Sequence, residues 1–266
     1  MGATGATEAD AELDVAITGA ASTVGRAVLP AFERAPAVTV TALTHREREG
    51  IDSELLEVTD PEDTAAKLAG YDVVVHLAAM SDPDDPWEAV LPVNVEGTYN
   101  VYEAAVAGGV DRVLFASTNH VVQMYNADDP AEPESLVADP EAIGTDAVPR
   151  PDSYYAVSKV FGEALGSYYV DRHRLEVVNL RIGWLDSEAL RSAVEAGGAL
   201  ARYARAMYLS ERDCRDALTK AATASLPENP LTVNVLSENA ERYLAITETM
   251  RTLGYDPRDD AADVFG

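Results

Sequence analysis

The chain has 266 residues and a mass of 28.4 kDa, which is long enough for one domain with a full hydrophobic core. Its 46 acidic and 20 basic residues give a formal net charge of −26, which argues against nucleic acids and anionic membrane surfaces as partners. The start has no export signal, no apolar run spans a membrane, and the single cysteine, Cys214, can form no internal disulfide, so we expect a cytoplasmic protein without a metal site.

Lysine occurs at only three positions, Lys67, Lys159 and Lys220. An acidic, lysine-poor composition resembles that of proteins from salt-loving archaea, where high salt screens the mutual repulsion of the carboxylates. In such a chain surface lysines are rare, so Lys159 is a candidate for a functional role.

After a tail over 1–11 that we expect to be disordered, residues 13–17 form a predicted buried strand that runs into a glycine-containing turn and a helix. Strand, glycine turn and helix together place backbone amides where they hold a pyrophosphate. The spacing is loose, with Ser22 where a middle glycine is expected, so a turn without a ligand is the alternative. The residues of this candidate site are Gly19, Ser22, Thr23, Val24 and Gly25.

A second predicted strand, 38–43, ends at Thr44-His45-Arg46. An acidic residue here would bond the ribose hydroxyls of NAD, whereas Arg46 could meet the 2′-phosphate of NADP. The sequence therefore favours NADP over NAD. A surface pair between Arg46 and a neighbouring glutamate is the alternative.

The middle of the chain continues the alternation of strands and helices, which predicts a doubly wound parallel sheet of the α/β class. Hydroxyl, amide and imidazole groups at 117–120 follow one of the strands, at the edge of the sheet where ligands bind. We expect strands at 54–58, 71–79, 112–116 and 175–180, and helices from Asp60-Pro61 and over 87–108.

Residues 124–151 are rich in Asp, Glu, Pro and Ala and show no clear period, so we predict a long loop. A lid over the site and a solvated excursion are both compatible with this composition. Beyond Gly183 we expect helical pieces over 188–207, a helix that begins at Ser210 with Asp213 as a capping box, a strand at 231–236, a helix over 241–253 and a polar tail.

The segment 152–172 carries Tyr155 and Lys159, which lie four residues apart and therefore share one face if the segment is helical. An ammonium about 4 Å from a phenol in a partly dry cleft can lower the phenol pKa by two or three units from about 10. The pair would then supply a proton acceptor near neutral pH. By itself this spacing also arises by chance in amphipathic helices.

Taken in order, these motifs resemble the extended short-chain dehydrogenase/reductase superfamily, from Leu13 to the C-terminus. Within it the chain looks most like the uronate dehydrogenases and the sugar 1-dehydrogenases of halophilic archaea, of the L-arabinose and glucose-6-phosphate type. The motifs are Thr18-Gly19-x-x-Ser22-x-x-Gly25, His76-Leu77-Ala78-Ala79, Asn94-x-x-Gly97-Thr98, Ser117-Thr118-Asn119-His120, Tyr155-x-x-x-Lys159 and Arg181-Ile182-Gly183.

The resemblance implies a role for each matching residue. Tyr155 would be the general base, Lys159 would hold the nicotinamide ribose, and Thr118 would bond the reacting hydroxyl. Sugar contacts would come from Ser81, Thr118, Asn119, His120, Tyr155 and Arg181, and further cofactor contacts from Thr44, His45, Arg46, Glu57, Val58, Leu77, Ala78, Ala79, Asn94 and Ile182.

The implied activity is NAD(P)-dependent oxidation of the anomeric carbon of a small aldose to the aldonolactone, with L-arabinose or a similar pentose or hexose as substrate. Uronate or glucose 6-phosphate as substrate, a nucleotide-sugar epimerase or dehydratase, and a non-enzymatic dinucleotide sensor are the alternatives. We expect a Rossmann core over 12–183, a small substrate-binding region over 184–266, and a homodimer or homotetramer.

Overall fold

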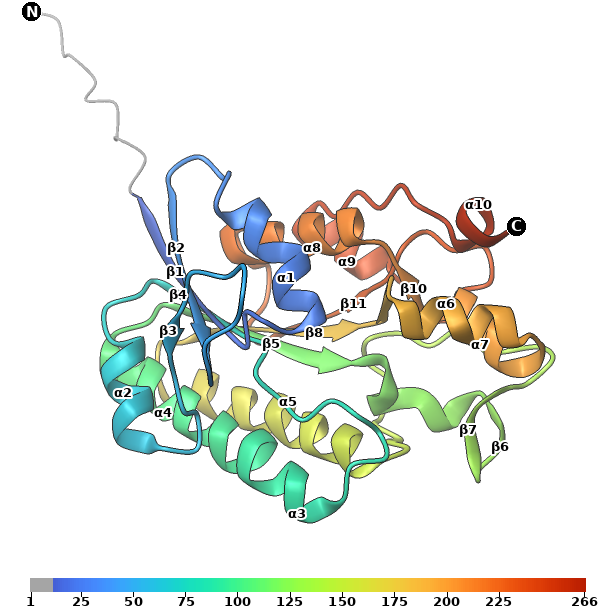
Figure 1. Ribbon diagram of the computed structural model, residues 1–266, viewed down its shortest axis with the longest axis horizontal. Coiled ribbons are helices and arrows are strands. Elements are labelled where there is room, and N and C mark those ends of the chain that lie inside the picture. Colours follow the sequence, from blue (N-terminus) through green and yellow to red (C-terminus); the bar gives the residue numbers. More distant parts are fainter. Residues whose placement is uncertain (1–11) are drawn as a thin grey trace, which may run out of the picture.

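A computed structural model describes residues 12–266, so the predicted disorder of 1–11 lies outside the described residues. The fold is a seven-stranded parallel sheet with helices on both faces, as predicted (Figure 1). In spatial order the strands are β11 (Leu231–Val235), β8 (Glu176–Ile182), β5 (Arg112–Thr118), β4 (Val73–His76), β1 (Leu13–Thr18), β2 (Val38–Thr44) and β3 (Glu54–Leu55).

Two helical layers cover the sheet, with α1, α8 and α9 on one face and α2, α4 and α5 on the other (Figure 1). The central strands are apolar on both faces because each face packs against a helical layer. These helices are α1 (Thr23–Phe32), α2 (Pro61–Leu68), α4 (Gly97–Gly108), α5 (Tyr154–Arg172), α8 (Glu211–Thr223) and α9 (Thr247–Leu253).

Helix α5 lies unusually close to the sheet because Gly162 faces the ring of Phe115 on β5. A Cβ atom at position 162 would sit 2.1 Å from Phe115 Cζ, a contact that no side chain can make. The helix begins at the N-cap Ser153, whose hydroxyl accepts a hydrogen bond from Ala156 N. These two features fix the height and the starting point of α5 above the carboxyl ends of β4 and β5.

Three helix predictions need correction. The expected helix over 87–108 is interrupted, because a π-helical stretch, η1 (Leu91–Glu96), separates α3 (Trp87–Val90) from α4 and contains Pro92, which has no N–H to donate. The helix expected over 241–253 begins only at Thr247, since backbone groups of Tyr243 and Ala245 instead bond Ile143. The polar tail ends in a short helix, α10 (Ala261–Phe265).

The predicted strand over 54–58 is reduced to Glu54–Leu55, and the predicted loop over 124–151 contains structure. It holds an antiparallel hairpin of β6 (Ala127–Asp129) and β7 (Glu132–Leu136), after the 3₁₀ segment η2 (Asn119–Tyr125). The prolines and acidic residues of this segment interrupt the apolar alternation by which a strand is recognised in a sequence. The hairpin packs on α7 (Gly198–Met207), which follows α6 (Glu188–Ala196), and so forms a wall beside the carboxyl edge of the sheet (Figure 1).

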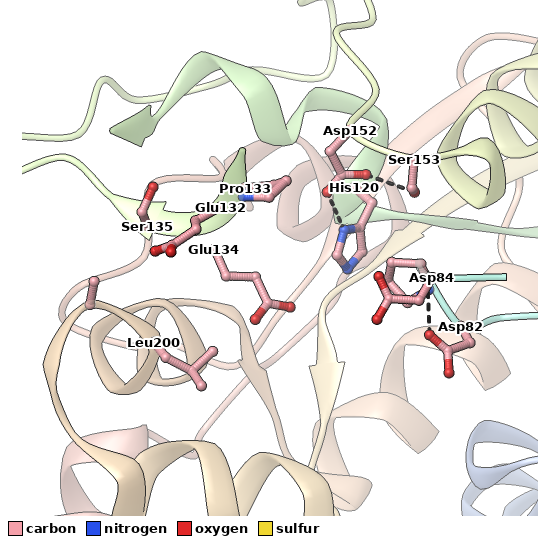
Figure 2. Close-up of a pocket in the computed structure, with 12 residues that line it drawn as sticks. Asp82, Asp84, His120, Glu132, Pro133, Glu134, Ser135, Asp152, Ser153 and Leu200 are labelled. Carbon is pink, nitrogen blue, oxygen red and sulfur yellow. Dashed lines mark hydrogen bonds and ion pairs between the residues drawn. The ribbon is translucent and has the colours of Figure 1, made fainter. Parts of the chain in front are cut away.

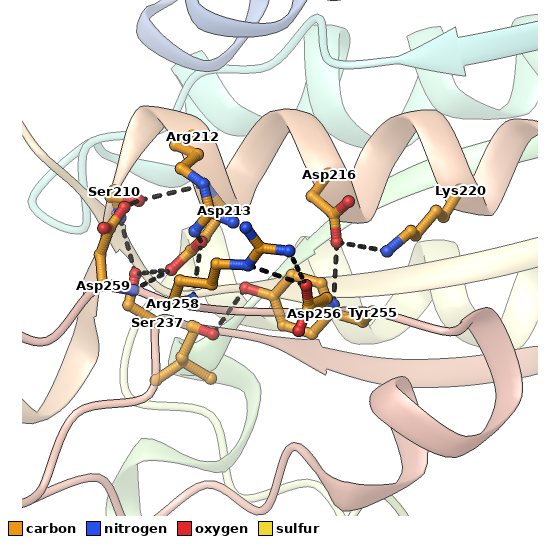
Figure 3. Close-up of polar contacts among 11 residues, drawn as sticks. Ser210, Arg212, Asp213, Asp216, Lys220, Ser237, Tyr255, Asp256, Arg258 and Asp259 are labelled. Atoms are coloured by element: carbon orange, nitrogen blue, oxygen red, sulfur yellow. Dashed lines mark hydrogen bonds and ion pairs between the residues drawn. The ribbon is translucent and has the colours of Figure 1, made fainter.

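The C-terminal segment is tied to α8 by the buried carboxylate of Asp213 (Figure 3). This carboxylate accepts hydrogen bonds from the Ser237 hydroxyl (2.7 Å) and from the backbone N–H groups of Arg258 and Asp259. The Ser210 hydroxyl caps α8 by accepting from Asp213 N, as predicted. The reciprocal half of the capping box does not form, because Ser210 N bonds Ser237 and the Asp213 carboxylate is engaged elsewhere. A short parallel pair, β9 (Trp184–Leu185) with β10 (Tyr208–Leu209), completes this region.

Candidate active site

The turn between β1 and α1 has the geometry expected of a phosphate-binding turn. Gly19 has φ +66°, and a Cβ atom there would lie 2.6 Å from Ala78 N, so the turn needs a glycine for both reasons. Ser22 is the N-cap of α1 and accepts from Gly25 N at 3.0 Å. The N–H groups of the first helical turn, at Thr23 and Val24, have no carbonyl partner within the helix and remain available to an anion.

A cavity of about 290 Å³ opens beside this turn, along the carboxyl ends of β1, β2 and β4. It contains most of the residues that the resemblance assigned to the adenosine side of a dinucleotide. The lining residues are Gly19, Ala21, Ser22, Leu43, Thr44, His45, Arg48, Leu56, Glu57, Val58, Leu77, Ala78, Ala79, Met80 and Val93.

The arginine at this cavity is Arg48, not Arg46. The Arg46 side chain is exposed and does not line the cavity, whereas Arg48 is half-buried, and its Nε is buried without a hydrogen-bond partner. A buried, unpaired guanidinium nitrogen calls for an acceptor. The sequence placed the cation two residues too early, because the turn after β2 carries Arg46 away from the cavity.

Asn94 is also placed differently from its expected role. It is buried, its Oδ1 accepts from Met80 N at 2.8 Å, and its Nδ2 donates to Met80 O and to the Ser158 hydroxyl. All its polar atoms are therefore used in joining η1 to α5 and to the segment after β4. Asn94 shapes the site rather than facing its cavity.

The proposed catalytic residues meet in a second cavity of about 160 Å³, directly adjoining the phosphate turn. Thr118 ends β5, while Tyr155 and Lys159 face it from the first turns of α5. The Thr118 hydroxyl lies near that of Tyr155 and favours its phenolate form. Ser81 and Ile182 lie in the same lining, which consists of Ser22, Thr23, Val24, Leu77, Ala79, Ser81, Ala116, Ser117, Thr118, Tyr155, Lys159, Ile182 and Gly183.

The acid–base properties of this pair differ from the sequence-based expectation. Burial raises the pKa of Tyr155 to about 12, opposed by the hydrogen bond with Thr118, and Lys159 is not among the causes. Burial lowers the pKa of Lys159 to about 7. The Lys159 ammonium lies 5.0 Å from the centre of the Phe115 ring and 5.7 Å from that of Tyr155. A lowered tyrosine pKa therefore requires additional positive charge in the cavity.

His120 and Asn119 diverge into two different roles at the end of β5. His120 Nδ1 donates to Asp152 Oδ2 at 2.6 Å, and its ring stands edge-on to that of Tyr155, with centroids 6.2 Å apart. Asn119 is buried and donates to the Tyr203 hydroxyl at 2.7 Å. His120 therefore lines a cavity, whereas Asn119 holds the Tyr203 hydroxyl.

Arg181 is committed to a buried ion pair. Its Nε and Nη2 donate to the two carboxylate oxygens of Glu163 at 2.9 and 2.8 Å, and its Nη1 donates to the carbonyl of Thr145. Glu163 also accepts from the Ser117 hydroxyl at 2.6 Å. A guanidinium held in this way has no free fork for a sugar carboxylate, so the structure assigns Arg181 to the scaffold and not to the sugar site.

Beyond His120 lies a third cavity, of about 520 Å³, between the β6–β7 hairpin, α7 and the segment after β4 (Figure 2). Its walls are acidic, although the described residues contain no group of three or more His, Cys, Asp or Glu side chains placed to hold a metal ion. The lining residues are Asp82, Pro83, Asp84, His120, Glu132, Pro133, Glu134, Ser135, Asp152, Ser153, Ala199 and Leu200.

Sequence reasoning missed four residues of the site: Arg48, Glu134, Asp152 and Glu163. Glu163 carried a usable signal, because it continues the stripe of Tyr155 and Lys159 at the same four-residue spacing. Asp152 and Glu134 carried none, since Glu134 stands in an acidic segment where every carboxylate looks alike and Asp152 is a lone carboxylate between proline and serine. Their positions depend on how that segment folds back over β5.

The site fits a nicotinamide dinucleotide on the observations of this chain. The turn at Gly19 leaves no room for a side chain, the first N–H groups of α1 are free of helical partners, and the side chain of Arg48 lines the adjoining cavity. Phosphate, ribose and base of such a molecule would lie along the carboxyl edge of the sheet, ending at Tyr155 and Lys159.

Comparison with known proteins agrees with this geometry. Residues 15–220 match the NAD dependent epimerase/dehydratase family. The chain is 55% identical to an L-arabinose 1-dehydrogenase (NAD(P)(+)) of Haloferax volcanii, over 94% of this chain and 98% of the relative. It is 33% identical to an NAD-dependent glucose-6-phosphate dehydrogenase of the same organism, over 94% of each. The crystal structure of uronate dehydrogenase from Agrobacterium tumefaciens has a TM-score of 0.76 and 26% identity, over 94% of this chain and 86% of that one.

Proposed function

The chain belongs to the NAD-dependent epimerase/dehydratase family, and we propose that it is an NAD(P)-dependent sugar 1-dehydrogenase that oxidises the anomeric carbon of an aldose, with L-arabinose as the first candidate. The observation that carries this proposal is the meeting of Thr118, Tyr155 and Lys159 in one cavity beside the phosphate turn. The high identity to an L-arabinose 1-dehydrogenase over nearly the whole chain supports the choice of sugar.

In this mechanism the cyclic sugar lies with its anomeric hydroxyl against the hydroxyls of Thr118 and Tyr155, which line one cavity. Thr118 holds the oxygen, and Tyr155 accepts the proton of that hydroxyl as the general base. The nicotinamide, when bound, supplies the acceptor for the hydride that leaves the same carbon. The carbon loses two electrons and one hydrogen as hydride, the oxygen loses a proton, and the product is the aldonolactone.

Lys159 assists the proton transfer through its charge and its position one turn from Tyr155. Its ammonium would bond a ribose hydroxyl of the dinucleotide and favour the phenolate of Tyr155. Because the pKa of Tyr155 is about 12 in the free chain, the positive charges at the nicotinamide and at Lys159 together must lower it for turnover.

The cofactor is NAD or NADP, and we favour NADP because the segment after β2 contributes Arg48 and no carboxylate to the cavity beside Thr44. The described helices include none that is both long and apolar enough to cross a membrane. A cytoplasmic location and a homodimer or homotetramer complete the proposal. The exposure of the large apolar side chains Tyr99, Val157 and Tyr168 on α4 and α5 supports an oligomer.

Mixing the purified protein in multimolar KCl with NADP or NAD and a panel of aldoses, uronates and sugar phosphates tests the function. We expect reduced nicotinamide to appear at 340 nm with L-arabinose, and the aldonolactone or its acid to appear in equal amount. No reduction with any free sugar, together with turnover of a nucleotide-linked sugar, would instead identify an epimerase or dehydratase. Dinucleotide binding without turnover of any sugar would identify a sensor.

A further inference from the structure

We propose that Glu134, together with Asp84, restricts the enzyme to uncharged aldoses by accepting hydrogen bonds from sugar hydroxyls and repelling sugars that carry a carboxylate or phosphate. This inference rests on the proposed function, because it takes the cavity beyond His120 as the place where the sugar extends away from Tyr155. It assigns a substrate-selecting role to the β6–β7 hairpin.

Glu134 lies where its carboxylate can reach a sugar in the cavity. It lies on β7, its side chain is half-buried, and its carboxylate points toward the side of the cavity that holds His120 and Asp84 (Figure 2). Burial first, and then the nearby charges of Asp152 and Asp84, raise its pKa, whereas His120 lowers it. The carboxylate thus faces two others and one imidazole across a single cavity.

The charge around this cavity is predominantly negative. Five of its lining residues are acidic, Asp82, Asp84, Glu132, Glu134 and Asp152, and the described lining contains neither lysine nor arginine. Asp152 is already engaged with His120 and with the Ser153 hydroxyl. Glu134 and Asp84 have no such side-chain partner among the contacts of the described residues, so their oxygens are free to accept from a ligand.

Arg181 and Arg202 do not compensate for these carboxylates, because both guanidinium groups are engaged elsewhere. Arg181 is held by Glu163, and Arg202 on α7 points its guanidinium at the carbonyls of Leu136, Val137 and Ala138. An anion in the cavity would therefore meet like charges at short range, the half-buried Glu134 on one side and the exposed Asp84 on the other. Hydroxyl groups are donors, and a carboxylate is an acceptor only, so a neutral sugar fits the same walls.

Three sugars with one ring configuration test the inference. L-arabinose, D-galactose and D-galacturonate share the configuration of C2 to C4 and carry hydrogen, hydroxymethyl or carboxylate at C5. We expect kcat/KM of the wild type for D-galacturonate to fall below that for D-galactose by roughly a hundredfold, and Glu134→Gln to reduce this preference by about tenfold. Asp84→Asn, at an exposed position that tolerates substitution, should shift the preference in the same direction.

Asp128→Asn is the matched control, because Asp128 is an exposed carboxylate on the same hairpin that does not line the cavity. It should leave the preference unchanged. Turnover of D-galacturonate as efficient as that of D-galactose by the wild type would overturn the inference. So would an unaltered preference in both Glu134→Gln and Asp84→Asn, provided that each variant still oxidises L-arabinose. Failure of the wild type with all three sugars would instead contradict the proposed function.

Discussion

Two opposing influences act on the Tyr155 hydroxyl, and they explain why the residue needs its neighbours. Burial favours the neutral phenol and raises its pKa to about 12, while the hydrogen bond with Thr118 favours the phenolate. Lys159 lies one turn away but is itself penalised by burial, with a pKa of about 7. Burial therefore opposes the charged forms of both side chains, and an added positive charge in the cavity would favour the phenolate of Tyr155.

Replacing Tyr155 with Phe removes the general base and leaves the ring in place. We expect kcat with L-arabinose to fall by roughly 10²- to 10⁴-fold, which is the usual contribution of a general base. Dinucleotide affinity, measured by fluorescence titration, should not fall comparably. A variant with wild-type turnover would remove Tyr155 from the mechanism.

Replacing Lys159 with Met tests the lowered pKa of the ammonium through stability. Between pH 7 and 10.5 the unfolded chain binds a proton at Lys159 that the folded chain does not, so stability rises with pH across this window. Below pH 7 the full cost of burying the ammonium is present. Urea unfolding should therefore show the variant more stable than the wild type near pH 7, by on the order of a few kcal/mol, with a gain that shrinks toward pH 10. A stability gain that does not vary with pH would contradict the lowered pKa of Lys159.

Arg48→Ala and Arg46→Ala form a matched pair for cofactor choice. Only Arg48 lines the adenosine-side cavity with a buried, unpaired nitrogen, whereas Arg46 is exposed. Loss of Arg48 should raise KM for NADP by about tenfold or more with little effect on NAD, because a charged hydrogen bond to the 2′-phosphate is lost. Arg46→Ala should leave the ratio unchanged. An equal effect of Arg48→Ala on both cofactors would mean that Arg48 shapes the cavity without recognising the 2′-phosphate.

At the scale of elements, α5 connects the chemistry to the scaffold. Tyr155, Lys159 and Glu163 follow one another at four-residue spacing along the face that looks onto the sheet. Glu163 is clamped by Arg181 from β8 and by Ser117 from β5, and Gly162 lets the helix sit on Phe115. The catalytic face of α5 is thus positioned by contacts to two strands of the sheet.

Arg181→Ala leaves the Glu163 carboxylate buried without its cation. We expect a loss of roughly 3–5 kcal/mol in the free energy of unfolding, as for other broken buried pairs. The double variant Arg181→Met with Glu163→Met should recover much of this loss, since no charge then stays buried. Wild-type stability in Arg181→Ala, with a raised KM for the sugar alone, would return Arg181 to the sugar site. Denaturant unfolding and sugar kinetics on the same preparations separate the two outcomes.

At the scale of the whole molecule, charge and exposed apolar surface are unevenly distributed. The net charge of −26 makes the folded state dependent on salt, because screening relieves the repulsion among carboxylates. Against this acidic background, Tyr99 on α4 and Tyr168 on α5 are about half exposed, and both lie near Tyr169. An apolar face on such a surface is a natural position for a second copy of the chain.

Tyr99→Glu combined with Tyr168→Glu should therefore shift the protein toward the monomer. The added carboxylates would face one another across the interface and repel, which sedimentation velocity in KCl would detect as a smaller species. Val148→Glu is the control, because Val148 is 72% exposed and lies on the loop before α5, outside this face. An unchanged oligomer in the double variant would place the interface elsewhere.

The sequence alone determined the elements that depend on local pattern. Apolar strands, the turn at Gly19, the cap at Ser210 and the helix that carries Tyr155 and Lys159 were all predictable, because their signals lie within a few residues of one another. The doubly wound sheet follows from the same patterns, whereas the roles of the site residues were implied by the family resemblance.

Only the tertiary structure decided which charges face the ligand. Arg46, Asn94 and Arg181 were expected in the site, yet the fold turns Arg46 to solvent, binds Asn94 to Met80 and pairs Arg181 with Glu163. Glu134 and Arg48 reach cavities although nothing in their segments marks them. The reason is physical: a polar side chain takes its role from the partner that the folded chain brings to it, and that partner lies 14 residues away for Asn94 and 18 for Arg181, beyond the reach of a local pattern.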